Sequence, residues 1–244
     1  VYAARNRLTA VVISIDHVTK AKGRTRILHG VSFTARAGRV TGFLGPNGAG
    51  KTSTLRILLG LDRPHGGTAL IDGVAYAALP RPLTRVGALL DGSGAHRSRT
   101  ARGHLHWLAA SNGIARARVA EVLDQVGLAG QARKRAGRFS LGMSRRLALA
   151  AALLGDPPVL ILDEPVNGLD PAGIRWMREF LRARAARGHT VLLSSHLMGE
   201  LAETVDDVVI IDGGRVVADG TLAAVTGGHR TLEDAFLTLT GATR

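Results

Sequence analysis

Apolar and polar positions alternate along the N-terminal part of the chain in a pattern typical of β-strands. The run "VVISIDHV" from Val11 predicts a strand, the polar stretch "KAKGRTR" predicts a turn, and "ILHGVSFTA" predicts a second strand paired with the first. A third, buried strand is predicted for "RVTGFL", which leads into a glycine-rich loop. Two short strands are predicted for "GGTALIDG" and "RVGALLD". This part of the chain is therefore predicted to be rich in β-structure.

From about residue 97 to residue 138 the apolar residues recur three and four positions apart, which indicates helices. The residues in this pattern are Leu105, Leu108, Val119, Val122, Leu123 and Val126. The run "SRRLALAAALL" continues the helical pattern. We therefore expect an α-helical insert, at about residues 92–150, between two β-rich parts of the chain.

The remaining segments alternate between strand and helix. "PVLILDEP" and "TVLLSS" predict buried strands on either side of the helix "PAGIRWMREFLRARAARG". "DDVVIIDGGRVVADG" predicts a hairpin that turns at Gly213 and Gly214, with Asp206 and Asp207 expected only to mark a solvent-exposed strand end. Because strands that alternate with helices form right-handed crossovers, we predict an α/β fold with a mostly parallel sheet, an N-terminal antiparallel β part and an inserted helical subdomain.

The chain is predicted to form one domain with a short appendage at each end. Residues 1–10 show no hydrophobic period and are expected to be a disordered basic lead-in, residues 11–230 to form the domain, and residues 231–244 to form a short amphipathic helix or tail. The longest apolar run, Leu147 to Leu154, is far shorter than the roughly 20 residues that cross a bilayer, and no signal peptide is evident. We therefore expect a soluble chain.

The composition narrows the classes of function. The absence of cysteine excludes disulfide frameworks, thiolate nucleophiles and sulfur-ligated metals, and it is consistent with a cytoplasmic location. The formal net charge of +13 comes mainly from arginine and would favour nucleic acid, anionic lipid or nucleotide as a neighbour. Alanine and arginine are abundant throughout, however, as a genomic bias would also produce. With two Trp, two Tyr and five Phe, an aromatic platform for stacking nucleic-acid bases is not expected.

The stretch "GPNGAGKT" contains the pattern G-x-x-x-x-G-K-[ST], with Gly45, Gly50, Lys51 and Thr52 at its fixed positions. It lies between a predicted strand and a predicted helix, which is the context that the pattern requires. Glycines let backbone N–H groups converge on phosphate oxygens, and the helix N-terminus adds partial positive charge. Lys51 is expected to reach the β- and γ-phosphates and Thr52 to ligate Mg²⁺. The loop is therefore predicted to bind a nucleoside triphosphate in a P-loop NTPase core.

A second motif follows the helical insert, where the apolar run "VLIL" ends in Asp163 and Glu164. In a parallel sheet this strand end lies at the same carboxyl edge as the glycine loop. Hydrolysis of a phosphate anhydride requires one carboxylate for the metal and an adjacent one that accepts a proton from water. An apolar run that ends in "DE" also occurs where a strand simply enters solvent, but its pairing with the glycine loop favours the hydrolytic interpretation.

With these two motifs on either side of the helical insert, the chain resembles the ATP-binding subunits of ABC transporters from about Ile13 to Gly220. "FSLGMSRRL" resembles the signature loop of that family, with "SLG" where Ser-Gly-Gly usually stands. "NGLD", which ends at Asp170, resembles the D-loop, and His196 after "LLSS" resembles the switch histidine. The order of these motifs distinguishes the chain from other P-loop ATPases, most of which lack a signature loop.

The resemblance implies an ATPase that binds ATP and Mg²⁺ between two chains, either a homodimer or this chain with a paired ATPase subunit. The two chains would close head to tail, so that Ser140 of one contacts the γ-phosphate held by the Lys51 loop of the other. Lys51, Glu164 and His196 are the expected catalytic residues, with Glu164 activating water and His196 contacting the γ-phosphate. The residues expected to contact nucleotide are Gly45, Pro46, Asn47, Gly48, Ala49, Gly50, Lys51, Thr52, Ser53, Asp91, Ser140, Leu141, Gly142, Met143 and Asp170, and those expected at the metal are Thr52, Asp163 and Asp91.

Two positions depart from the family pattern. Asp91 stands where most members have the glutamine of the Q-loop. An acidic residue there, like "SLGM" in the signature, resembles the branch that exports bacitracin-like and lantibiotic peptides, which usually carries Glu; because Asp is shorter, its contact with the metal stays open. No aromatic residue near Lys22 can stack on adenine, so Lys22 or Arg24 is expected to stack instead. Selectivity for ATP over GTP also stays open.

The leading hypothesis is an ATPase subunit, peripheral on the cytoplasmic face of the membrane, that powers export of a drug or antibiotic peptide through a separate transmembrane permease. The permease would dock near residues 91–99 and the helical insert, and no nucleic-acid partner is expected. The alternative is a soluble ABC-type ATPase that acts on ribosomes or DNA. Those relatives usually have tandem ATPase units, or coiled-coil or zinc insertions, which this chain lacks. A module that binds nucleotide without hydrolysis is disfavoured by Lys51, Asp163 and Glu164.

Overall fold

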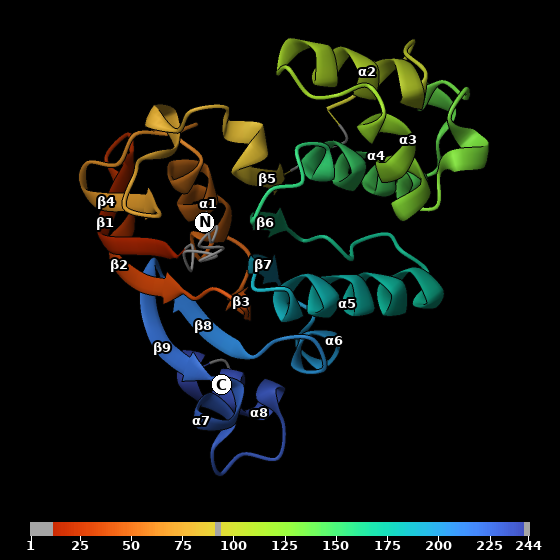
Figure 1. Cartoon of the computed structure of the whole chain (residues 1–244). Coiled ribbons are helices and arrows are strands. Elements are labelled where there is room, and N and C mark those ends of the chain that lie inside the picture. Colours follow the sequence, from red (N-terminus) through yellow and green to blue (C-terminus); the bar gives the residue numbers. More distant parts are fainter. Residues whose placement is uncertain (1–11, 91–93, 242–244) are drawn as a thin grey trace, which may run out of the picture.

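The structure, a computed structural model, describes residues 12–90 and 94–241 (Figure 1). Its strands form an antiparallel sheet and a mostly parallel sheet. The antiparallel sheet has the order β2-β1-β4 and contains β1 (Ile13–Lys22), β2 (Thr25–Ala35) and β4 (Gly66–Ile71). The second sheet has the order β5-β6-β7-β3-β8-β9 and contains β3 (Val40–Leu44), β5 (Val86–Leu89), β6 (Val159–Asp163), β7 (Thr190–Ser195), β8 (Asp207–Asp212) and β9 (Arg215–Thr221). Its neighbouring strands are parallel except for the β8–β9 hairpin.

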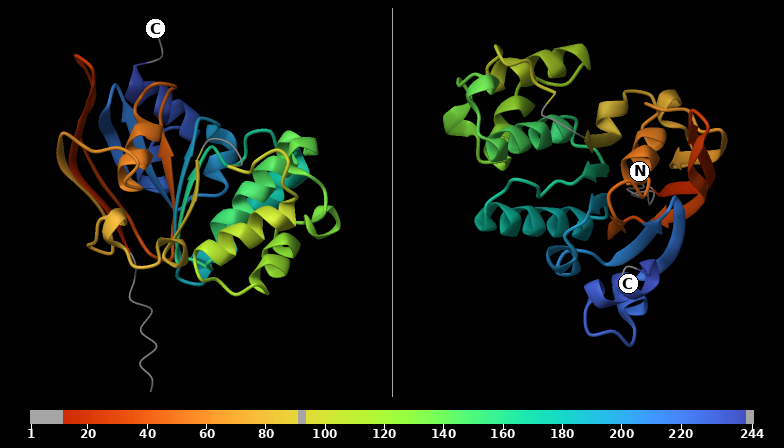
Figure 2. Two further views of the ribbon diagram at one scale, coloured as in Figure 1. Left: turned by 90° about the horizontal axis from the view of Figure 1, so that it is seen from above. Right: turned by 180° about the vertical axis from the view of Figure 1, so that it is seen from behind.

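Helices cover the parallel sheet and extend beyond it. The described helices are α1 (Lys51–Leu58), α2 (Ala101–Ser111), α3 (Arg118–Gln125), α4 (Leu141–Leu153), α5 (Pro171–Ala186), α6 (Met198–Ala202), α7 (Leu222–Thr226) and α8 (Leu232–Thr240), with 3₁₀ turns at Tyr76–Ala78, Pro82–Thr84, Ala129–Gln131 and Ala136–Arg138. The antiparallel sheet and helices α2 and α3 lie on opposite sides of the parallel sheet (Figure 2). The helical insert therefore forms a separate lobe of the same molecule.

The hydrophobic core consists of two clusters, one on each face of the parallel sheet. On β6, Val159 and Ile161 join a cluster with the antiparallel sheet and α1, whereas Leu160 and Leu162 join a cluster with α4, α5 and the helical insert. Because side chains alternate between the two faces of a strand, a strand buried on both faces is apolar throughout. This explains why β3, β6 and β7 are continuously buried.

The carboxyl ends of β3, β6 and β7 lie side by side. Leu44 at the end of β3 pairs with Ser195 on β7, and Asp163 at the end of β6 pairs with Ser194 on β7. The segments that follow these strands therefore leave the sheet at one edge, where an α/β fold places its ligand. In this chain those segments are the glycine loop, Glu164 and His196.

The predicted fold class is confirmed, together with the order of its strands and helices along the chain. Two local expectations need correction. The turn predicted for "KAKGRTR" is present but covers only Gly23 and Arg24, because β1 continues to Lys22 and β2 begins at Thr25. Asp206 and Asp207 do not mark a solvent-exposed end: Asp207 is buried and begins β8, where Arg39 donates to both of its carboxylate oxygens at 2.5 and 2.8 Å.

Some segments with sequence-based predictions lie outside the described residues. The predicted lead-in at residues 1–10 and Asp91 lie outside them. At the other end, helix α8 occupies the segment where a tail helix was expected from residue 231. It begins at Leu232, and Oγ1 of the preceding Thr231 accepts a hydrogen bond from the N–H of Asp234. No helix in residues 12–90 and 94–241 has the length and apolar character that crossing a membrane requires.

Candidate functional site

The loop at residues 45–50 connects β3 to α1, and its shape depends on glycine at two positions. Gly50 has a φ of 109°, and a Cβ atom there would lie 2.5 Å from the side chain of Leu28. A Cβ atom at Gly45 would lie 2.3 Å from the carbonyl oxygen of Ile211. Helix α1 then begins at Lys51 without a side-chain cap or an acidic residue in its first turn. Because the first N–H groups of a helix lack intrahelical partners, this end of α1 offers donors and partial positive charge to a phosphate group.

The ammonium group of Lys51 folds back over the loop. It donates to the carbonyl oxygens of Gly45 at 2.6 Å and Pro46 at 3.2 Å, and the residue is buried. Burial lowers the pKa of Lys51, while the carboxylates of Glu164 and Asp163 oppose that shift. An anionic ligand in the loop would add negative charge beside this buried cation and would favour its charged form further.

Two hydroxyl groups fix the carboxylate of Asp163 at the end of β6. Thr52 Oγ1, on α1, donates to Oδ2 at 2.8 Å, and Ser194 Oγ, on β7, donates to Oδ1. The Thr52 hydroxyl and the Asp163 carboxylate form a set of oxygen donors, which is the ligand type that Mg²⁺ prefers. Mg²⁺ commonly binds through one or two carboxylates together with the phosphates of a substrate, so these residues fit a Mg²⁺ ion that arrives with a nucleotide.

Glu164 is held in an unusual backbone conformation beside Asp163. Its φ is 50°, in the left-handed region, and its N–H donates to the carbonyl oxygen of Ser194 at 3.2 Å and to Ser194 Oγ at 3.1 Å. Nδ1 of His196 lies 2.9 Å from Glu164 Oε1. The other oxygen, Oε2, is buried and accepts no hydrogen bond from the described residues. A buried carboxylate oxygen without a protein donor is suited to accept a hydrogen bond from a bound water.

Most of the glycine loop, together with Thr52, Asp163 and Glu164, lines one cleft at the carboxyl edge of the parallel sheet. Of the residues expected at the nucleotide or the metal, the cleft brings together Pro46, Asn47, Gly48, Gly50, Lys51, Thr52, Ser53, Asp163 and Glu164. Lys22 and Ile27 also line it, whereas Arg24 does not. The region beside Lys22 is where the sequence lacks the expected aromatic residue, and the structure offers the aliphatic side chain of Ile27 there instead.

The signature segment lines a different cleft. Its walls include the expected residues Ser140, Leu141, Gly142, Met143 and Asp170, together with Arg146, Gly168 and Leu169. None of these residues lines the cleft of the glycine loop. The expected nucleotide contacts are therefore divided between two separate places on one chain.

Helix caps shape this second cleft. Ser140 Oγ accepts a hydrogen bond from Met143 N at the start of α4, and Asp170 Oδ1 accepts one from Gly173 N at the start of α5. Leu141, which takes the place of a glycine in the signature, is 63% exposed. Two helix N-termini thus open onto the cleft beside an exposed apolar side chain.

Three contributors to the first cleft were not identified from sequence. Ser194 contacts both Asp163 and Glu164, Ile27 forms part of the wall near Lys22, and the Glu164 backbone adopts a positive φ. The strand "TVLLSS" was predicted, but only its pairing with β6 reveals which serine faces the carboxylates. No comparable local signal in the sequence identifies Ile27.

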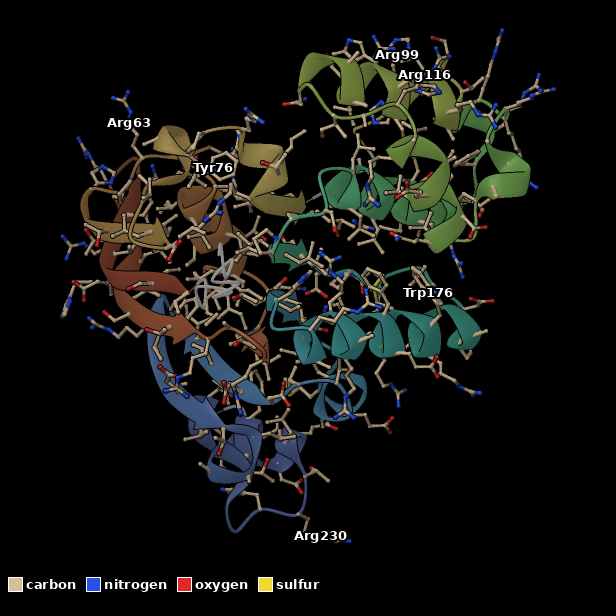
Figure 3. All side chains as sticks on the ribbon, in the orientation of Figure 1. Arg63, Tyr76, Arg99, Arg116, Trp176 and Arg230 are labelled. Atoms are coloured by element: carbon tan, nitrogen blue, oxygen red, sulfur yellow. The ribbon has the colours of Figure 1, made fainter. Side chains whose placement is uncertain are left out.

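Lys22 and Lys51 line the loop cleft and Arg146 lines the signature cleft, whereas other basic residues lie elsewhere. Figure 3 shows Arg99 and Arg116 on the helical insert, Arg63 beside the antiparallel sheet and Arg230 near the C-terminal helices. These arginines lie at distant parts of the surface.

Comparisons with known proteins agree with the geometry. Residues 28–167 match the family model described as "ABC transporter". The chain is 39% identical over 213 residues to "Bacitracin transport ATP-binding protein BcrA" of Bacillus licheniformis, covering 86% of this chain and 70% of that protein. It is 40% identical over 228 residues to "Daunorubicin resistance ATP-binding protein DrrA3" of Streptomyces coeruleorubidus, covering 89% and 72%.

A shorter relative and a solved structure match over nearly the whole chain. "Lantibiotic transport ATP-binding protein SrtF" of Streptococcus pyogenes is 31% identical over 225 residues, which cover 92% of this chain and 96% of that protein. The solved structure described as "Structure of ATP binding subunit of ABC transporter" superimposes with a TM-score of 0.86 at 27% identity, covering 94% of this chain and 99% of the other. The likeness therefore extends from the glycine loop to both lobes of the fold.

Proposed function

Since the chain belongs to the ABC transporter family, as an ATP-binding subunit that hydrolyses ATP, we propose that it dimerises on ATP and powers export of a drug or antibiotic peptide through a separate membrane permease. The observation that carries the dimer is the division of the expected nucleotide contacts. Lys51, Thr52, Asp163 and Glu164 line one cleft, and Ser140 lines another. Head-to-tail pairing would bring the signature cleft of one chain to the loop cleft of the other and complete two sites.

In the proposed reaction the residues of the loop cleft act on the γ-phosphate and on a water. Lys51 turns from the carbonyl oxygens of its own loop to the β- and γ-phosphates, and the N-terminus of α1 stabilises their negative charge. Thr52 and Asp163 would hold Mg²⁺, which shields the phosphate charge when it is bound with ATP. Glu164 accepts a proton from the attacking water through its unpaired Oε2, while His196 orients Oε1 and contacts the γ-phosphate.

The signature cleft completes the site from the partner chain. The Ser140 hydroxyl and the N-terminus of α4 add hydrogen-bond donors to the γ-phosphate. These contacts exist only while the γ-phosphate is attached, so ATP favours the closed dimer and hydrolysis removes that preference. A permease could couple this change between an ATP-bound closed dimer and an open state to transport.

The proposed cargo follows from the proteins that the chain resembles. Their names refer to bacitracin transport, lantibiotic transport and daunorubicin resistance. The permease would supply the path across the bilayer and would receive this subunit on the cytoplasmic face of the membrane. Docking near residues 91–99 and the helical insert, and a role for Asp91 near Mg²⁺, remain part of the proposal.

Capture of partners tests the transport role. Tagged Glu164→Gln protein is incubated with ATP and detergent-solubilised membranes of the source cells, and the bound proteins are identified by mass spectrometry. We expect an ATP-dependent polytopic membrane protein, and we expect Lys51→Ala to recover less of it under the same conditions. Recovery of ribosomal or DNA-bound proteins in its place would favour the soluble alternative and overturn the transport role.

A further inference from the structure

Ser194 lies between the two carboxylate residues of the loop cleft without lining the cleft itself. It is the register partner of Asp163 on the adjacent parallel strand, and it is fully buried. Leu192, two positions earlier on β7, packs with α1 and the antiparallel sheet, whereas Leu193 packs on the opposite face. Because side chains two positions apart share a face, the Ser194 hydroxyl is directed to the face that carries Asp163.

One hydroxyl group serves two neighbours at this position. Ser194 Oγ donates its proton to Asp163 Oδ1 and accepts the backbone N–H of Glu164 at 3.1 Å. Since Thr52 donates to the other oxygen of Asp163 at 2.8 Å, the carboxylate is held from two different elements. Rotation of the Asp163 side chain would break at least one of these bonds.

The bond to Glu164 acts on the backbone. A positive φ is disfavoured for residues other than glycine and persists when surrounding contacts enforce it. At Glu164, with its φ of 50°, the N–H donates to both the Ser194 carbonyl oxygen and its hydroxyl. This conformation sets the direction in which the Glu164 side chain leaves the strand.

We propose that Ser194 is a positioning residue for ATP hydrolysis, because its single hydroxyl ties the metal-side carboxylate of Asp163 to the backbone of Glu164. The inference rests on the proposed function, in which these two residues hold Mg²⁺ and activate water. Ser194 would not touch the nucleotide. It would fix the relative placement of the two groups that do the chemistry, which is a common role of residues behind a metal site.

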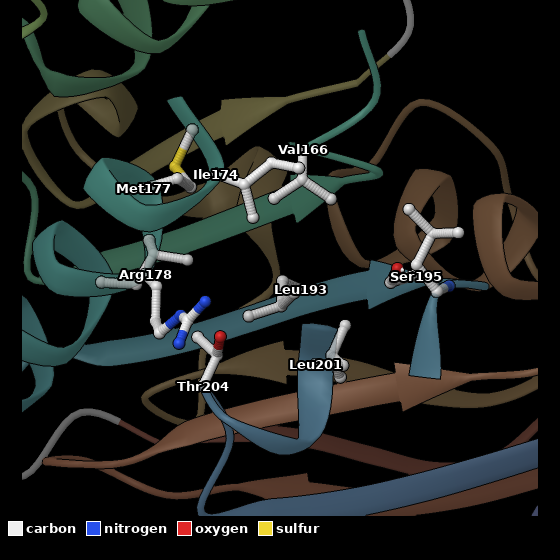
Figure 4. A pocket seen from close by; sticks show the side chains of 10 residues that line it. Val166, Ile174, Met177, Arg178, Leu193, Ser195, Leu201 and Thr204 are labelled. Carbon is white, nitrogen blue, oxygen red and sulfur yellow. Dashed lines mark hydrogen bonds between the residues drawn. The ribbon is translucent and has the colours of Figure 1, made fainter. Parts of the chain in front are cut away.

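The next residue provides a matched control. Ser195 is also fully buried, but it faces the opposite side of β7, where it lines a small, mostly apolar pocket with Leu193 and Leu201 (Figure 4). Its hydroxyl accepts the N–H of Leu197 at 3.0 Å and contacts neither carboxylate. Replacing Ser195 by alanine removes the same atom from the same strand and leaves the hydrogen bonds of Ser194 to Asp163 and Glu164 in place.

Three variants separate positioning from folding: Ser194→Ala, Ser194→Thr and Ser195→Ala. The Thr variant keeps the hydroxyl and has the β-branched shape that strands accommodate. For each variant we would measure kcat and KM for ATP with Mg²⁺, and the affinity for Mn²⁺ by electron paramagnetic resonance in the presence of a non-hydrolysable ATP analogue. Thermal unfolding of each variant without nucleotide reports the structural effect alone.

We expect Ser194→Ala to lower kcat and to weaken Mn²⁺ binding by about tenfold or more, as is typical when a residue behind a metal ligand is lost. KM for ATP should change less than kcat, Ser194→Thr should recover most of both losses, and Ser195→Ala should stay within about twofold of the wild type. Ser194→Ala with unchanged kcat and Mn²⁺ affinity, or equal losses in Ser194→Ala and Ser195→Ala, would overturn the proposal. A wild-type chain that does not hydrolyse ATP would instead contradict the proposed function.

Discussion

The Nδ1 atom of His196 lies 2.9 Å from Oε1 of Glu164, so that the segments after β7 and β6 meet beside the loop cleft, which Glu164 lines. The two side chains differ in exposure: that of His196 is 42% exposed and that of Glu164 is 18% exposed. The carboxylate is therefore held from the solvent side by the imidazole, while its other oxygen stays buried. This arrangement orients a base toward the place where the γ-phosphate is proposed to lie.

Replacing His196 by alanine should release the Glu164 side chain. We expect kcat for ATP hydrolysis to fall by about a hundredfold or more, in line with the usual contribution of a positioned base, while ATP binding is retained. Steady-state ATPase assays together with titration of a fluorescent ATP analogue would separate the two effects. Turnover within about twofold of the wild type would show that the contact has no part in catalysis.

The residues that line the loop cleft near Lys22 suggest that the protein discriminates only weakly between ATP and GTP. Lys22 is exposed and Ile27 is half-buried, and no aromatic side chain is among the described residues that line the cleft. We expect the affinities for ATP and GTP to lie within about threefold of each other. Lys22→Tyr should tighten ATP binding by about tenfold, because stacking of a base on an aromatic ring contributes roughly 1–3 kcal/mol.

Isothermal titration calorimetry with both nucleotides would measure these affinities. Arg24→Tyr is the matched control, since Arg24 does not line the cleft and its replacement should leave both affinities unchanged. Equal effects of the two tyrosine substitutions would show that the base does not bind beside Lys22.

We expect the ion pair between Arg39 and Asp207 to contribute substantially to the free energy of unfolding. Asp207 is buried, and the paired carboxylate raises the pKa of Arg39 chiefly through their hydrogen bonds. Asp207→Ala would remove both hydrogen bonds to the buried carboxylate and leave the partly exposed Arg39 guanidinium with its hydrogen bond to the Asp206 carbonyl oxygen, so we expect the free energy of unfolding to fall by about 2 kcal/mol. Asp72→Ala, which breaks an exposed pair with Arg85, should cost less than about 1 kcal/mol.

Urea denaturation of both variants would test this difference. Equal losses of stability for Asp207→Ala and Asp72→Ala would contradict the importance assigned to burial of the Asp207 carboxylate. If both variants still hydrolyse ATP at urea concentrations below the unfolding transition, the substitutions change the stability of the fold and not the catalytic site.

Because the imidazole of His104 is buried, we expect this residue to make the stability of the fold decrease at acidic pH. Burial, and to a smaller extent the charge of Arg99, hold the pKa of His104 below its ordinary value. As the pH falls below about 6.5, His104 therefore binds a proton more readily in the unfolded chain than in the folded one. The free energy of unfolding decreases as the pH falls from about 6.5 toward the lowered pKa of the folded state. His104→Leu should reduce the drop in Tm between about pH 7 and pH 5.

Differential scanning fluorimetry across that range would measure the effect. The exposed His229→Gln is the control, and we expect it to follow the wild type. An unchanged dependence of Tm on pH in His104→Leu would show that His104 is not the source of the acid sensitivity.

Local sequence signals account for much of the fold. The glycine pattern around Lys51, the apolar run before Asp163 and the two-residue alternation of β1 and β2 each lie within a few consecutive residues. Their structures depend mainly on short-range geometry, and the strands and helices they predict are present. The resemblance to the family also led us to expect that one chain holds only half of each ATP site, and this stays a prediction.

Long-range pairing explains what the sequence did not reveal. β3 lies between β7 and β8, whose residues are far from it in the chain, and the contacts of Ser194 depend on that sheet order and on its register with β6. Asp207 was misjudged for the same reason, because its partner Arg39 comes from a distant segment beside β3. Pairs of this kind cannot be predicted from the spacing of neighbouring residues.

In the proposed dimer, each ATP site combines the Lys51 loop of one chain with the signature cleft of another. Size-exclusion chromatography with light scattering on Glu164→Gln protein tests it directly, with and without ATP. We expect a dimer with ATP and a monomer without it. Adding Ser140→Arg, which would fill the signature cleft, should keep the protein monomeric at saturating ATP. A Glu164→Gln chain that binds ATP as a monomer, or a dimer that persists with Ser140→Arg, would contradict the claim.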